Sequence, residues 1–130
     1  MAVSADYLSY VLEQLAGISG LSSRRMFGAI GLYADGAFFC VIDDDTVFLK
    51  TDSTNRDDYE SRGMKRFMPY PDDSQRSSTT MGYHEVPADI LEDAELLAAW
   101  ARKSIAVAVA AAARKAPREA VNGRKRKRRP

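Results

Sequence analysis

The stretch RRMFGAIGLYADGAFFC, Arg24 to Cys40, contains three glycines and is rich in apolar and aromatic residues. Its dipeptide Asp35-Gly36 is among the strongest short signals for a tight turn between antiparallel strands, because glycine readily adopts the positive φ that such turns need. Apolar and aromatic residues lie on both sides of this dipeptide. The stretch therefore predicts a β-hairpin, with strands at about 26–33 and 37–42.

A glycine-rich loop that holds a phosphate is the alternative interpretation of this stretch. Such a loop leads from a strand into the N-terminus of a helix, where backbone N–H groups converge on the anion. Here a second strand follows, and no Lys-Ser or Lys-Thr pair closes the pattern. We therefore assign the glycines structural roles: Gly36 in a turn, and Gly28 and Gly31 at a bulge, a bend or the close approach of a large side chain. The structural motif comprises Met26, Phe27, Gly28, Gly31 and Gly36.

Arg24 and Arg25 precede the first predicted strand. We expect them in solvent or paired with a nearby acid, and they are also the candidate contacts to a partner. Further along the chain, the sequence indicates helices at 5–16, within 51–62 and from Asp93 to about Ala113, and strands at 46–50, 67–70 and 79–86. Interrupting an antiparallel sheet with helices gives an α+β, two-layer domain in the order α-β-β-β-α-β-β-α.

The charge is unevenly distributed. Residues 118–130 hold seven of the 19 basic residues and one of the 18 acidic residues, so the net charge of +1 combines an acidic body with a basic end. We predict a domain at 1–116 and a disordered tail at 117–130. The tail contains the candidate nucleic-acid contacts Arg124, Lys125, Arg126, Lys127, Arg128 and Arg129. They would bind DNA non-specifically; a solubilising terminus and a contact with the acidic body remain the alternatives.

Weaker signals in the sequence indicate the cellular compartment and the possible association with a membrane or a second copy. There is one cysteine, the N-terminus has no leading Lys or Arg, and the uncharged run 104–113 is about half the length of a membrane span. We therefore expect a cytoplasmic protein with no membrane partner. The last predicted helix is apolar nearly all round, which is typical of a helix with neighbours on several sides and allows a homodimer contact.

The sequence gives little support for a catalytic site or a cofactor-binding site. His84 and Cys40 are the only residues of their types, and Cys40 lies in an apolar run typical of an inert buried thiol. Asp43, Asp44 and Asp45 lack the spacing of a calcium loop. We predict no catalytic residue, no metal and no cofactor, and hence no enzyme.

Aromatic residues on the predicted sheet could stack nucleic-acid bases. They are Phe27, Tyr33, Phe38, Phe39 and Phe48. Base-stacking sheets also carry interleaved basic side chains. No basic residue lies between Met26 and Val47, so core packing is the better interpretation.

The order of these motifs resembles the N-terminal domain of the TfoX/Sxy family. The matching pieces are RMFGAIGLYADGAFF, the stretch VFLKTD at 47–52, MGYHEVP at 81–87 and Trp100, and the resemblance runs from about residue 7 to 113. It implies a two-layer fold like that of secretion chaperones. It also implies a role like that of the competence regulators, which act as transcriptional co-activators beside the cyclic-AMP receptor protein. Full-length members carry a second, C-terminal domain, and the matching pieces here account for the first.

Three functional hypotheses follow. In the first, the domain is a regulatory module that binds a protein partner such as the transcription machinery, while the tail tethers DNA. In the second, it is a dimeric, chaperone-like protein-binding domain with no role in nucleic-acid binding. In the third, it is an enzyme, which requires a cleft where titratable groups such as Cys40, His84 and carboxylates converge.

Overall fold

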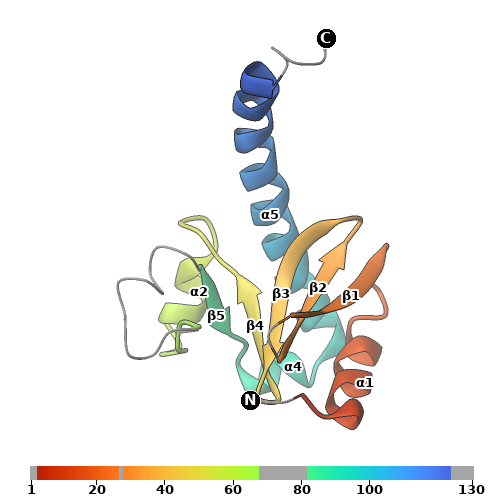
Figure 1. Cartoon of the computed structure of the whole chain (residues 1–130). Coiled ribbons are helices and arrows are strands. Elements are labelled where there is room, and N and C mark those ends of the chain that lie inside the picture. The colour runs from red at the N-terminus through yellow and green to blue at the C-terminus, as the bar shows by residue number, and fades with distance from the viewer. Residues whose placement is uncertain (1–2, 27, 68–81, 124–130) are drawn as a thin grey trace.

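The computed structural model describes residues 3–26, 28–67 and 82–123, and from residue 115 onward it describes the backbone alone. Figure 1 shows a sheet with a long helix running behind it. The elements are α1 (Ala5–Gln14), β1 (Leu21–Met26), β2 (Ala29–Ala34), β3 (Ala37–Asp43), β4 (Thr46–Lys50), α2 (Arg56–Glu60), β5 (Tyr83–Glu85), α4 (Ala88–Leu91) and α5 (Ala94–Gly123). The predicted α+β fold with an antiparallel sheet is therefore confirmed.

The five strands pair in chain order, β1-β2-β3-β4-β5, and every neighbouring pair is antiparallel. Tight turns make this meander possible. Asp35 and Gly36, with φ of 49° and 84°, join β2 to β3, and Asp44 and Asp45, with φ of 52° and 51°, join β3 to β4. Such turns match the right-handed twist of the strands, and Asp tolerates positive φ better than most residues. Both predicted turns are confirmed.

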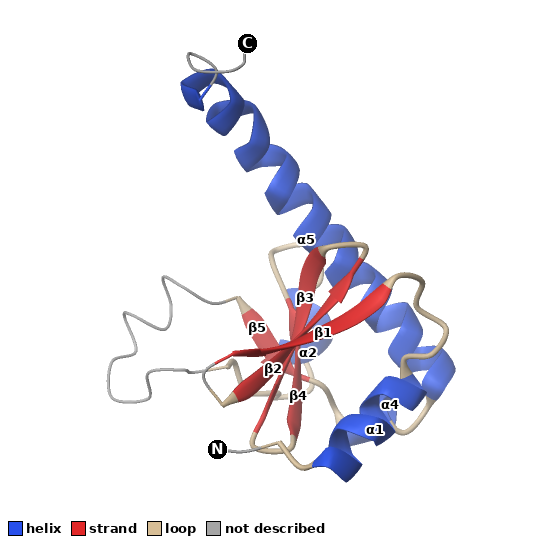
Figure 2. Ribbon diagram, turned by 45° about the vertical axis from the view of Figure 1, so that its right-hand side comes forward, coloured by secondary structure: helices blue, strands red, loops and turns tan. Residues whose placement is uncertain are grey.

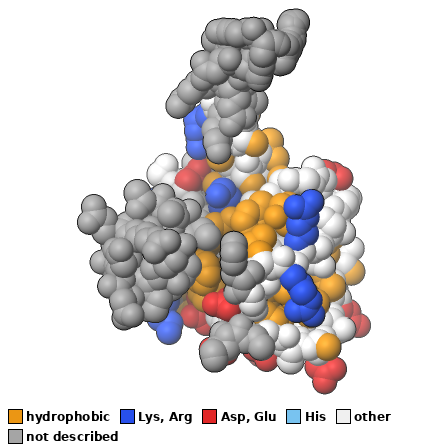
Figure 3. Space-filling model, viewed as in Figure 1, with side chains coloured by type: hydrophobic (Ala, Val, Ile, Leu, Met, Phe, Trp, Pro, Cys, Tyr) orange, Lys and Arg blue, Asp and Glu red, His pale blue; other side chains and the backbone are white. Residues whose placement is uncertain are grey.

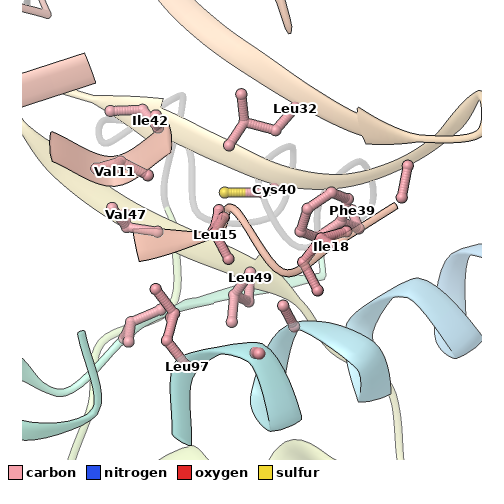
Figure 4. Close-up of a cluster of buried hydrophobic side chains, with 14 of the residues drawn as sticks. Val11, Leu15, Ile18, Leu32, Phe39, Cys40, Ile42, Val47, Leu49 and Leu97 are labelled. Atoms are coloured by element: carbon pink, nitrogen blue, oxygen red, sulfur yellow. The ribbon is translucent and has the colours of Figure 1, made fainter. Parts of the chain in front are cut away.

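The main core lies between the sheet and the helices, which pack on one face of the sheet (Figure 2). Figure 4 shows side chains from α1, the strands and α5 converging there, and they include Val11, Leu15, Leu32, Cys40, Leu49 and Leu97. A separate, smaller cluster of Val41, Phe67 and Tyr83 lies outside this core. Because strand side chains alternate between faces, the neighbours Cys40 and Val41 belong to opposite faces.

Helix α5 begins where the sequence predicts. Asp93 caps it, because its Oδ1 accepts hydrogen bonds from the backbone N–H groups of Glu95 and Leu96 at 3.1 and 3.2 Å. Residues Ala94–Arg114 are long and apolar enough to cross a membrane by length and composition alone. This stretch buries Leu97 and Ala101 completely against the sheet, so we interpret it as a core helix.

Some predicted boundaries are wrong. The strand predicted at about 26–33 is β2, Ala29–Ala34, and β1 before it was not predicted, because its polar residues on an exposed edge show no hydrophobic alternation. The short second helix predicted within 51–62 is confirmed as Arg56–Glu60. Of the strand predicted at 79–86, residues 79–81 lie outside the described residues, and the structure shows Tyr83–Glu85.

The structure also corrects the end of the last helix. Helix α5 continues to Gly123, past the predicted end near Ala113. Ala, Arg and Lys are strong helix formers, and this propensity outweighs the disruption caused by Pro117. Residues 124–130 of the predicted tail lie outside the described residues, as do 68–70 of the strand predicted at 67–70.

Candidate functional site

The face of the sheet opposite the helices carries a group of aromatic and apolar side chains, which we call the aromatic face. Its members are Tyr33, Phe38, Val41, Phe48 and Tyr83 from the strands, with Phe67 packed against them. Val41, Phe67 and Tyr83 are buried, whereas Tyr33, Phe38 and Phe48 are half-buried. Figure 3 shows hydrophobic side chains gathered on this side of the molecule, with basic side chains around them.

Three rings of the aromatic face, those of Tyr33, Phe38 and Tyr83, form a continuous row. Tyr33 stacks on Phe38 with ring centroids 5.0 Å apart, and Phe38 contacts Tyr83 at 5.7 Å. A cation closes each end: Arg24 Cζ lies 5.5 Å from the Tyr33 centroid, and Lys50 Nζ lies 5.0 Å from that of Tyr83. Such contacts contribute about 0.5–1 kcal/mol each at exposed sites.

This row revises the interpretation of the sheet aromatics. Phe39 is fully buried in the main core, as predicted, but Tyr33, Phe38 and Phe48 lie on the aromatic face. Phe27 lies outside the described residues. The basic side chains that the sequence lacks between Met26 and Val47 come from Arg24 and Lys50, just beyond that interval, because neighbouring strands bring them beside the rings.

The structure places Arg24 and Arg25 inside β1 rather than before the first strand. Both are exposed. Arg24 pairs with Gly31 and Arg25 pairs with Ile30 in the adjacent strand. Ile30 belongs to the main core, so Arg25 is on the face that carries the helices, and Arg24 is on the aromatic face. The two candidate partner contacts therefore do not form one patch.

The glycine motif shapes a hairpin and holds no phosphate loop, since β2 and β3 follow it without an intervening helix. Gly28, with φ of 84°, lies in the turn where Met26 pairs with Ala29, so the prediction that it lies inside a strand is wrong. At Gly31 a Cβ atom would lie 2.8 Å from both Met26 Cε and Phe38 Cε1, which confirms the expected close approach of large side chains. The register shift between β2 and β3 lies between Leu32 and Tyr33, and therefore not at a glycine.

His84 forms the centre of a polar cluster that the sequence did not reveal. Its Nδ1 lies 2.9 Å from Thr51 Oγ1, and its Nε2 lies 3.2 Å from Glu60 Oε2. Burial lowers the pKa of His84, and the hydrogen bond and charge of Glu60 partly oppose this effect. Thr51 and His84 are both buried, so a substrate has no access to the hydroxyl. The spacing of the three residues along the chain gives no signal that could have found them.

Cys40 does not join this cluster. Leu49 lies between Cys40 and His84, because it pairs with Cys40 in β3 and with His84 in β5. Cys40 is completely buried, and burial raises the pKa of its thiol. Cys40 and His84, which the enzyme hypothesis requires to converge, therefore do not form a pair. Among the described residues no group of three or more His, Cys, Asp or Glu side chains could hold a metal ion.

Two surface hollows flank the helices. One of about 310 Å³ lies between α5 and the β2–β3 turn, and another of about 430 Å³ lies between α1 and α5. Arg102 lines both, and its guanidinium donates to the carbonyl of Gly17 at 3.5 Å. Neither hollow contains His84, Cys40 or the rings of the aromatic face.

The candidate nucleic-acid contacts at 124–129 lie outside the described residues. A model of the TfoX N-terminal domain matches residues 13–108 of the chain. No curated protein matches the chain. The matched range contains all five strands, so the aromatic face and β1 belong to the matched domain.

Proposed function

Because the chain belongs to the TfoX N-terminal domain family, which is regulatory, we propose that it is a non-enzymatic module acting through a protein partner. The observation that carries this proposal is the aromatic face. The described helices pack on the other side of the sheet, and half-buried Tyr33, Phe38 and Phe48 are left on this one. Tyr, Phe and Arg are enriched at the centres of protein interfaces, and the same types occur in this row.

Site-specific crosslinking tests the proposal. A photoreactive phenylalanine derivative is introduced at Phe38 in the native cell, and the matched control carries it at Leu96, which is 45% exposed on α5. We expect a discrete crosslinked protein from position 38 and none from position 96. Equal, diffuse labelling at both positions, or none at position 38, would contradict a partner on the aromatic face.

The finer role that we propose is transcriptional co-regulation in competence, in the cytoplasm, with the basic residues 124–129 tethering DNA. The support is the sequence of this run and the electrostatic, sequence-independent character of such contacts. Binding of a fluorescent duplex is compared between the full chain and a chain ending at Gly123, which keeps α5 intact. We expect the full chain alone to bind, with affinity falling steeply as salt rises. If the two chains bind alike, the tail has no tethering role.

A dimeric, chaperone-like protein-binding domain is the second candidate. Val109 on α5 is 54% exposed, and the helix continues well beyond it, to Gly123. A second copy packed along this part of α5 would cover Val109. Light scattering at high concentration tests this candidate, with Val109→Glu as the variant: a dimer that the substitution dissociates supports it, and a monomer throughout rules it out.

A further inference from the structure

Strand β1 is an edge strand of the described sheet. Within the described part of the chain it pairs with β2 and with nothing on its other side. Ser22 to Arg25 are exposed, and Figures 1 and 2 show no described element beside this edge. The opposite edge is different, because β5 is bonded to residues 65–67: Phe67 N–H donates to Tyr83 O and Glu85 N–H donates to Lys65 O, both at 2.8 Å.

The register shows which backbone groups face the open side. Asp35 N–H donates to Gly20 O at 2.9 Å, so these two residues form a hydrogen-bonded pair next to the pair Leu21–Ala34. Hydrogen-bonded and non-hydrogen-bonded pairs alternate along an antiparallel ladder. The N–H and C=O groups of Leu21, Ser23 and Arg25 therefore point away from β2. They form a template on which another strand can pair.

The charges on β1 indicate which kind of partner strand can pair with it. Arg24 and Arg25 are the only charged residues of β1 and β2, and they lie on opposite faces. A strand that follows β1 presents its own successive side chains to opposite faces as well. Two consecutive acidic residues at its centre would thus meet both arginines, one on each side of the sheet.

The same charges disfavour a second copy of this chain. In an antiparallel pair of β1 strands from two copies, the groups of Leu21, Ser23 and Arg25 must face those of the other copy, which leaves two registers that pair most of β1. In one register Arg24 lies directly opposite Arg24 of the second copy. In the other, these two arginines lie diagonally across the strands, within about 8 Å. Like charges opposite each other destabilise a ladder, so β1 suits a different, acidic strand.

We propose that β1 is a strand-addition site for an extended segment of a partner protein whose centre carries two consecutive acidic residues. This inference rests on the proposed function, because it identifies the chemistry of one segment of the partner. Backbone hydrogen bonds to Leu21, Ser23 and Arg25 supply affinity, and the two ion pairs supply selectivity. The aromatic face beside Arg24 extends the contact surface.

The first test measures charge and pairing separately. The probe is a fluorescent ten-residue peptide of alternating Thr and Val with Glu-Glu at its centre. It is matched by a Lys-Lys peptide and by a Glu-Glu peptide with N-methyl groups on the edge that faces β1. Against the full chain we expect binding of the Glu-Glu peptide alone. The double variant Arg24→Glu/Arg25→Glu should bind it about tenfold more weakly and prefer the Lys-Lys peptide.

The second test uses proline, which lacks a backbone donor. Ser23→Pro removes an N–H group that points to the open edge, a position where a strand tolerates proline, whereas Ser23→Thr retains it. We expect loss of peptide binding in the first variant only, and slower exchange of the Ser23 and Arg25 amide protons when peptide is bound to the unaltered chain. Equal binding of the N-methylated peptide, or no charge preference, overturns the proposal even if Ser23→Pro fails to fold.

Two further outcomes separate this inference from the proposed function. If the Phe38 crosslink to a cellular protein persists in Ser23→Pro, the chain is still a protein-binding module and strand addition at β1 is wrong. If sedimentation shows that Ser23→Pro dissociates a dimer while the Glu-Glu peptide does not bind, a second copy occupies the edge, and the acidic-strand proposal is again wrong.

Discussion

The hydroxyl of Thr51 lies 2.9 Å from Nδ1 of His84, and this buried hydrogen bond joins the end of β4 to β5. The two side chains are 6% and 2% exposed, so water cannot replace either partner. Glu60 completes the link to α2 from the other side of the ring, at 3.2 Å. The short strand β5 is thus held by side-chain contacts as well as by its three backbone pairs with β4.

We expect Thr51→Val to lower the free energy of unfolding by about 1–3 kcal/mol, because it preserves the shape of the side chain but leaves His84 Nδ1 buried without a partner. Chemical denaturation measures the change. The matched control is Thr46→Val, where the hydroxyl bonds Asp44 O in an exposed turn and its loss should cost much less. Equal losses at the two positions would show that the buried hydrogen bond contributes nothing of its own.

The stability of the domain should depend on pH through His84. Burial lowers its pKa below the ordinary value of 6.5, so between that lowered pKa and 6.5 the unfolded chain binds more protons than the folded one. The free energy of unfolding therefore falls as the pH drops through 6.5, and the full loss is present below the pKa of the folded state. NMR titration follows one set of ring resonances, because the chain has a single histidine.

The control for this titration is Glu60→Gln. The carboxylate of Glu60 favours the charged ring, so its removal should lower the pKa of His84 further. A pKa above 6.5 in the unaltered protein, or an upward shift in the variant, would contradict the balance in which burial outweighs the ion pair.

Gly31→Ala should destabilise the protein by about 1–3 kcal/mol, because the new methyl group would lie 2.8 Å from both Met26 Cε and Phe38 Cε1. Met26 can move more easily than the stacked ring of Phe38, so part of the loss should return in the double variant with Met26→Ala. Thermal unfolding gives both values. Gly17→Ala is the matched control, since nothing lies within 4 Å of its Cβ position, and a loss there equal to that at position 31 would exclude crowding as the cause.

The contrast between these positions shows what the sequence could predict. Turns at Asp35-Gly36 and Asp43–Asp45 follow from local φ preferences, and the cap at Asp93 follows from a side chain that bonds its own helix. These are contacts within a few residues. The α+β class could be predicted from them because a meander needs only short turns between consecutive strands.

The candidate site depends on contacts between residues far apart in the chain. Arg24, Tyr33, Phe38, Tyr83 and Lys50 form one row only because four strand pairings bring them together. Strand β1 was missed for a related reason: LSSRRM is exposed on an edge, so no hydrophobic alternation marks it. Because β1 was not predicted, it could not be derived from the sequence that Arg24 and Arg25 lie on opposite faces of the sheet.

The thiol of Cys40 should react with an aromatic disulfide reagent only when the domain opens. Cys40 is completely buried, burial raises the pKa of its thiol, and Leu49 separates it from His84, so neither access nor a neighbouring base generates a thiolate. We expect Ser53→Cys, at an exposed position, to supply an internal standard that reacts faster by about a hundredfold or more. The rate at Cys40 should then rise with denaturant in parallel with unfolding. Rapid reaction at Cys40 in the native protein, faster in the presence of His84 than in His84→Gln, would instead restore the Cys–His pair and with it the enzyme hypothesis.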